Sequence, residues 1–174
     1  MSNWIYKVFL LTLFLSAIFS VIINLVTRNA NILIILILII LVMLIAFIFD
    51  MIATSALTSK EASFHAKNSK KIKGAKESLW IVKNNVKVAS ICSDVIGDIL
   101  GIASGALGAV LAINFSQTMN FNIVITSILV AAFISAFTVG GKAICKEIAV
   151  RRSDKITFKV AKVIHFFKFK KKKK

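Results

Sequence analysis

Long apolar runs dominate the chain and are separated by short polar or basic links. Four windows each supply the roughly 20 mainly apolar residues that a helix needs to cross a bilayer. This pattern predicts an all-α, polytopic membrane protein with four transmembrane helices. The windows are Trp4 to Val26, Ile32 to Leu57, Val88 to Ile113 and Phe121 to Ile144.

The first apolar window raises the question of a cleaved signal peptide. Its run exceeds the length of a signal peptide's apolar core, and the sequence Asn24-Leu25-Val26-Thr27 offers no pair of small residues for cleavage. We therefore interpret residues 1–31 as an extra, retained transmembrane helix with a short external link.

Basic residues are distributed unevenly among the links. The segment from Lys60 to Lys87 carries eight lysines and two glutamates, and the stretch from Lys142 to Lys174 carries thirteen lysines or arginines. By contrast, Arg28 to Asn31 has one basic residue and Asn114 to Asn120 has none. Because cytoplasmic loops retain positive charge, we expect a multi-pass protein of the cell membrane with cytoplasmic N and C termini.

The basic link also has helical periodicity. We expect a juxtamembrane hairpin at about residues 60–85, with Gly74 separating two short helices because glycine weakens a helix interior. It should lie at the cytoplasmic membrane surface, with its lysines extended into water. Its predicted apolar contacts are Ala62, Phe64, Ala66, Ile72, Leu79, Trp80 and Val82.

A final helix is predicted after the fourth window. Ser153 can cap it, and it should run to about Phe169 along the membrane interface. Residues 168–174 form a polylysine tail. The predicted apolar stripe of this helix is Ile156, Val160, Val163, Ile164 and Phe167.

The net charge of +16 bears on possible partners. Because the basic residues flank membrane helices instead of forming a recognition fold, we expect anionic lipid headgroups as partners and no nucleic acid. The sequence contains no recognisable nucleotide-binding motif, zinc-ligand cluster or pair of nucleophile and base, so it does not indicate an enzyme.

Two acids, Asp94 and Asp98, lie inside the third window. A carboxylate at membrane depth costs roughly 2.5 to 3.5 kcal/mol, which makes each of them a candidate functional residue. Their spacing of four places both on one helix face. Gly97, Gly101 and Gly105 repeat at the same spacing and predict close helix packing, or alternatively carbonyl oxygens that face an ion.

The second window contributes further polar groups near its end. Asp50 is followed by Thr54 and Ser55, and then by two more hydroxyl residues. These oxygens suit a hard cation such as Mg²⁺, although hydroxyls in helices also bond to the carbonyls of their own helix. Lys142 and Lys146 compete with an ion, because either could pair with Asp50, Asp94 or Asp98 as a structural ion pair.

Several short motifs resemble the transmembrane domain of the CNNM and CorB/CorC magnesium transporters. The sequence ALTS at Ala56 to Ser59 is similar to the end of that family's S-x-E-T-A-L-T-S pattern, and KGA lies at Lys73 to Ala75. Ile96-Gly97-Asp98 is similar to its I-G-N motif. A second match is GGKAICKEIAVRRSDKI at residues 140–156, which is similar to G-E-x-x-P-K followed by E-K-I.

The resemblance covers roughly residues 32–167 and implies a homodimer with a partly dehydrated Mg²⁺ between its spans. The metal ligands implied are Ser55, Gly97, Asp98 and the backbone of Gly140 or Gly141, with Asp94 adding negative charge. Asp50, Thr54 and Lys142 would then be second-layer or counter-charge residues. No counterpart of the family's CBS pair or CorC carboxy-terminal domain is recognisable.

Three positions depart from the family pattern. Its glutamates fall on Thr54 and Lys142, and its proline falls on Cys145. The sequence thus favours a Mg²⁺ or related divalent-cation transporter or ion-binding membrane protein that is not driven by ATP. A non-transporting accessory or scaffold subunit of another membrane protein, with structural Asp–Lys pairs, is the alternative.

Overall fold

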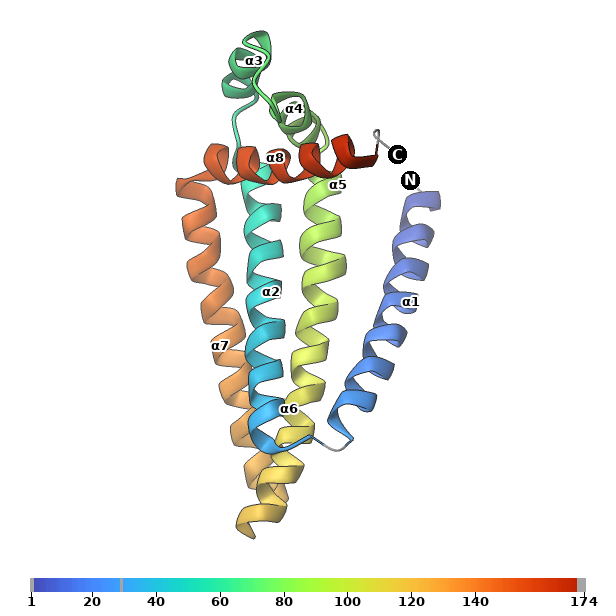
Figure 1. Cartoon of the computed structure of the whole chain (residues 1–174). Helices are drawn as coiled ribbons and strands as arrows, with labels where there is room; N and C mark the ends of the chain where they lie inside the picture. Colours follow the sequence, from blue (N-terminus) through green and yellow to red (C-terminus); the bar gives the residue numbers. More distant parts are fainter. Residues whose placement is uncertain (1, 29, 172–174) are drawn as a thin grey trace. The chain divides into compact units, whose positions relative to one another are not determined.

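The long apolar runs form long helices in the computed structural model, which describes residues 2–28 and 30–171, without the side chains of 2–5 and 169–171. All regular structure in these ranges is helical (Figure 1). The elements are α1 (Ser2–Thr27), α2 (Ile32–Thr58), α3 (Glu61–Ser69), α4 (Ala75–Lys83), α5 (Asn85–Ala89), the π-helix η1 (Ser90–Gly97), α6 (Asp98–Met119), α7 (Ile123–Arg151) and α8 (Ser153–Lys171).

Four helical stretches are long and apolar enough to cross a membrane. They cover Tyr6–Thr27, Ile32–Thr58, Asn85–Met119 and Ile123–Arg151. The all-helical class is therefore confirmed, as are four helices long and apolar enough to span a membrane, and the last two extend beyond the predicted windows. The third is continuous through α5, η1 and α6.

The chain divides into two compact units. The first consists of the chain up to Phe47 together with Asp94–Gly141, and the second of Ile48–Ser93 with the residues from Lys142 onward. The first unit has a core in which Ile35, Ile39 and Met43 of α2 pack with Leu107 of α6. In the same unit α1 contacts α6.

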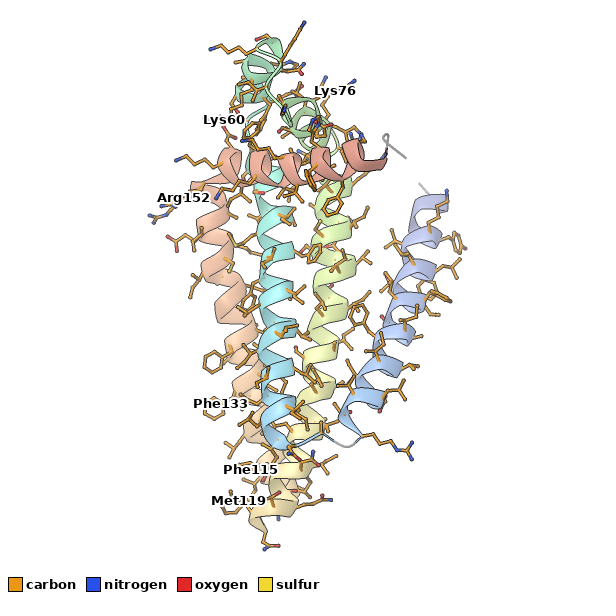
Figure 2. All side chains as sticks on the ribbon, in the orientation of Figure 1. Lys60, Lys76, Phe115, Met119, Phe133 and Arg152 are labelled. Atoms are coloured by element: carbon orange, nitrogen blue, oxygen red, sulfur yellow. The ribbon has the colours of Figure 1, made fainter. Side chains whose placement is uncertain are left out.

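Helix packing in the first unit depends on two glycines. A β-carbon on Gly108 would lie 2.3 Å from Cδ1 of Ile134, and one on Gly141 would lie 2.2 Å from Cζ of Phe47. These positions bring α6 against α7 and α7 against α2. Most of α7 is nevertheless exposed, and Figure 2 shows Phe133 pointing away from the ribbon, in accord with its exposed fraction of 62%.

The predicted hairpin is present in the second unit as α3 and α4. Gly74 separates them with φ of +88°, a left-handed conformation that suits glycine. Phe64 of α3 packs with Leu79 and Val82 of α4, as the sequence predicted. Trp80, however, is 60% exposed.

Ile81 of α4 is buried, although it was not among the predicted apolar contacts of the hairpin. It packs with Ala56 of α2 and Ala161 of α8. Helix α4 therefore packs on two sides, against α3 and against α2 and α8. The predicted apolar contacts described only the first of these. Ile72, Ala62 and Ala66, three further predicted contacts, are exposed.

Helix α8 lies across the ends of α2 and α5 in the second unit (Figure 1). Ser59 and Thr157 share a hydroxyl hydrogen bond of 2.8 Å, and the backbone N–H of Lys60 donates to Oδ1 of Asp154 at 3.0 Å. Figure 2 shows Lys60 and Arg152 at this same end of the unit, together with Lys76. The basic residues thus surround the end of α2.

The stripe predicted for α8 is its packing face only in part: Val160 packs against the cluster of Ala56, Ile81 and Ala161, and Ile156 is partly buried. Thr157 and Ala161 are buried, whereas Val163 and Phe167 are 56% and 66% exposed. The hydroxyl of Ser153 donates to the carbonyl of Thr58 at 3.5 Å, so it binds α2. The helix continues to Lys171, so the predicted tail is partly helical, and residues 172–174 lie outside the described residues.

A partly buried, hydrogen-bonded pair of side chains joins α4 to α8. Nδ1 of His165 donates to Oε1 of Glu77 at 3.1 Å, and the Glu77 side chain is only 12% exposed. Burial raises the pKa of Glu77, but the hydrogen bond from His165, a backbone hydrogen bond and the charges of His165 and Lys168 outweigh it. The net effect lowers the pKa below its usual value of 4.5.

Adjacent glycines provide a matched test of the α2–α7 contact. Gly141→Ala should destabilise the protein by about 1 to 3 kcal/mol because its methyl group overlaps the Phe47 ring. Gly140→Ala should be neutral or stabilising, because a β-carbon there meets nothing within 4 Å. Thermal unfolding in detergent micelles measures both, and equal effects would contradict the contact.

Ionised Glu77 should stabilise the docking of α8 in a pH-dependent manner. Because its pKa is lowered in the folded state, its contribution is present above its usual pKa and is lost as pH falls through the folded value. Glu77→Gln should therefore lower the melting temperature at neutral pH, with a difference from the wild type that vanishes in acid. Glu61→Gln, in an exposed pair with His65, serves as the control and should change little.

Candidate functional site

A single carboxylate is buried near the end of α2. Asp50 is 1% exposed, and no charged or hydrogen-bonding side chain precedes it in that helix. An isolated charge in such surroundings is costly unless other groups compensate it. The residues around Asp50 therefore define the candidate site.

Ser93 supplies one compensating group. Its hydroxyl donates to Oδ1 of Asp50 at 2.8 Å. Ser93 lies in η1, where eight residues of π-helix join α5 to α6. Short π-helical segments inside α-helices frequently accompany functional sites.

Lys146 of α7 supplies the opposite charge. Its Nζ lies 3.6 Å from Oδ2 of Asp50, and its side chain is 52% exposed. This separation exceeds the usual length of a charge-assisted hydrogen bond. Oδ2 is buried and has no hydrogen-bond partner among the described residues, so one oxygen of Asp50 is bonded and the other is balanced only by charge.

This arrangement decides between the two predicted lysine competitors. Lys146 forms an ion pair with Asp50, whereas Lys142, on the same helix, is partly buried. Lys146 was one of the two lysines predicted to pair with an acid. Ser93 was not predicted as a partner of Asp50. The available signal for Ser93 was a hydroxyl inside an apolar span, immediately before Asp94.

Ser55, a predicted metal ligand, takes part in a hydroxyl network with α8. It is fully buried, donates to the carbonyl of Ile52 at 3.0 Å and accepts a hydrogen bond from Thr157 at 3.3 Å. Thr58 likewise donates to the carbonyl of Thr54 at 2.8 Å. The alternative that these hydroxyls bond to their own helix is thus confirmed for Ser55 and Thr58.

The acids Asp94 and Asp98 are placed differently from Asp50. Both side chains are exposed, Asp94 in η1 and Asp98 at the start of α6. β-Carbons on Gly101 and Gly105 would meet nothing within 4 Å. These four residues form an open face of the first unit, hereafter the acidic face.

The predicted glycines have two different environments. Gly97 is buried, whereas a β-carbon on Gly101 or Gly105 would meet no atom of the described residues within 4 Å. Gly108 makes the close approach to α7 instead. Gly101 and Gly108 are seven residues apart, about two helical turns, and share nearly the same face of α6, so the difference depends on where α7 comes close and not on the helical repeat.

The remaining predicted residues lie on α7 and α2. Gly140 is exposed and Gly141 lies against Phe47. Thr54 is partly buried, and its carbonyl accepts the bond from Thr58. Ser55 belongs to the second unit, while Gly97, Asp98 and the two glycines of α7 belong to the first.

The donor set bears on the predicted Mg²⁺. No three His, Cys, Asp or Glu side chains gather closely enough for a metal ion in the part of the chain that the structure describes. A cation at Asp50 would consequently rely on one carboxylate with hydroxyl, carbonyl and water oxygens. Mg²⁺ accepts such a set, since it retains several waters in proteins.

Comparisons with protein-family models, curated proteins and solved structures give no significant match. The function must accordingly be argued from the residues themselves. The site has one buried carboxylate oxygen, Oδ2 of Asp50, that no hydrogen bond from the described residues reaches, and such an oxygen can accept a hydrogen bond or a cation.

Removing the Ser93 hydroxyl tests the importance of its bond to Asp50. Ser93→Ala should destabilise the protein by about 1.5 to 3 kcal/mol, the usual value for a hydrogen bond to a charged group. Ser104→Ala is the control, because that buried hydroxyl donates only to Gly101 of its own helix. Chemical unfolding in micelles gives both values, and a Ser93→Ala effect no larger than the control would contradict the assignment.

Proposed function

We propose that this chain is an integral membrane protein that binds Mg²⁺ or a related divalent cation and moves it across the membrane without ATP. The buried Asp50 carboxylate carries the proposal, because Oδ2 lacks a hydrogen-bond partner among the described residues. Intramembrane acids are rare and usually mark ion or proton pathways. The membrane potential or exchange with another cation would drive the movement.

The motif resemblance to the CNNM and CorB/CorC domain supports the same ion. It adds Asp94 and Asp98 as proposed ion-binding residues, together with Ser55 and the glycine carbonyls of Gly97 and of Gly140 or Gly141. In this proposal Asp50 is the central ligand within the second unit, and the residues of the first unit rest on the motif resemblance alone. Lys142 remains a proposed counter-charge.

We propose that two copies of this chain form a homodimer in the cell membrane. Asp94 and Asp98 are exposed on the chain, and a charge directed into lipid is costly. Gly101 and Gly105, which are open beside them, would allow a second copy to approach closely. A second copy covering the acidic face would remove both acids from lipid.

Both termini are proposed to be cytoplasmic, on the side of the basic hairpin. Helix α8 leaves Val163, Phe166 and Phe167 exposed, and Lys159 and Lys168 are exposed on the same helix. Apolar side chains combined with lysines suit a helix lying in the interface of an anionic membrane. α8 would thereby hold the end of α2, which contains Asp50, at the membrane surface.

The second candidate function is a non-transporting accessory subunit. The ion pair between Lys146 and Asp50 favours it, because a purely structural pair needs no other ligand. In that case Asp50→Asn and Lys146→Met should each destabilise the protein, while the double variant should recover stability. Mg²⁺ should have no effect on any of them.

Mg²⁺ flux into proteoliposomes under an imposed potential tests the transport proposal. Asp50→Asn should reduce the flux by at least about tenfold, equivalent to about 1.4 kcal/mol of lost ion binding. Glu147→Gln is the control, since that acid is exposed and paired with Arg151. Asp94→Asn with Asp98→Asn should reduce the flux less, through weaker attraction.

The flux measurement also has a decisive negative result. Absence of Mg²⁺ flux for the wild type, in a preparation shown to be folded by its unfolding transition, would reject transport. Full flux in Asp50→Asn would instead mean that the ion path does not depend on this carboxylate.

A further inference from the structure

We propose that Lys146 is a built-in cation that occupies the Asp50 site until a divalent ion replaces it. Binding of the ion to Oδ2 of Asp50 would then require the Lys146 ammonium group to leave. This inference rests on the proposed function, because it names how occupancy of the same site is controlled. The ion proposed to replace Lys146 is a small, hard cation such as Mg²⁺.

The geometry separates a fixed contact from an exchangeable one. Oδ1 of Asp50 accepts a short hydrogen bond of 2.8 Å from Ser93. Oδ2 has only the ammonium group of Lys146 at 3.6 Å, and no hydrogen bond from the described residues reaches it. Replacing Lys146 would therefore leave the orientation of the carboxylate unchanged, since Ser93 continues to hold it.

Charge makes the two cations mutually exclusive. One carboxylate beside both a divalent ion and an ammonium group would leave a net charge of about +2 in a poorly solvated site, which is strongly unfavourable. Asp50 is 1% exposed, so water screens the repulsion poorly. A divalent ion can bind stably only when Lys146 has withdrawn.

The position of Lys146 permits that withdrawal. Its side chain is 52% exposed, although the carboxylate that it balances is buried. It lies in the last two turns of α7 before Arg151, where that helix ends. A long, flexible lysine side chain near a helix end can extend its charged group toward water.

Mg²⁺ binding to the full-length protein in micelles, measured by titration calorimetry, tests the exchange. Lys146→Met should bind Mg²⁺ at least about tenfold more tightly than the wild type, because the competing cation is gone. Lys155→Met, at an exposed lysine of α8, should remain within about twofold. Asp50→Asn should abolish binding.

A second measurement uses the unaltered chain and avoids any folding defect of Lys146→Met. Saturating Mg²⁺ should increase the rate at which an amine-specific reagent modifies Lys146, by about threefold or more if most of the pairing is released. Peptide mass spectrometry quantifies the modification. The rate at Lys155, an exposed lysine of α8, should stay constant.

The outcomes separate the exchange from the proposed function. If the wild type binds Mg²⁺ through Asp50 but Lys146→Met binds no more tightly and Lys146 reactivity is unchanged, the exchange is wrong and ion binding stands. If neither the wild type nor Lys146→Met binds Mg²⁺, both proposals are rejected. Tight binding that appears only in Lys146→Met supports Lys146 as the occupant of the site and rejects binding by the native chain.

Discussion

The burial of one carboxylate inside an apolar helix constrains the second unit of this protein. Asp50 is tolerated because Ser93 bonds one oxygen and Lys146 balances the other. Removing one partner of a buried ion pair commonly costs about 3 to 5 kcal/mol. The residues Asp50 of α2, Ser93 of η1 and Lys146 of α7 must therefore stay at the same level along their helices. The π-helical backbone of η1 lies at this level.

Helix α8 and the hairpin stabilise the end of α2 that holds this site. Ala56, Ile81 and Ala161 form a small shared core, which Ser55, Ser59 and Thr157 extend with hydroxyl contacts. Small residues allow these helices to approach closely, and the hydroxyls satisfy one another away from water. The same region carries dense positive charge, with Lys60, Arg152 and Lys155 exposed close to these packed helices.

The candidate site shows where inference from sequence is strong and where it is weak. Asp50 and the competing lysines were identifiable because charged residues are expensive in apolar spans. Ser93 was missed, since a serine in a span is inexpensive and its partner lies 43 positions away in the chain. Asp94 and Asp98 were the stronger candidates from the sequence, because two acids four residues apart share one helix face. The fold buries Asp50 instead.

The sequence by itself determined the helical class, the four long apolar helices and the break at Gly74, because these follow from local composition and from the conformational freedom of glycine. Only the tertiary structure decided which polar groups meet. It selected Lys146 to pair with Asp50, turned Gly108 and not Gly105 toward α7, and buried Thr157 of α8 while leaving Phe167 exposed. Helical periodicity defines the faces of each helix, but the choice among those faces depends on side chains that are distant in sequence and close in space.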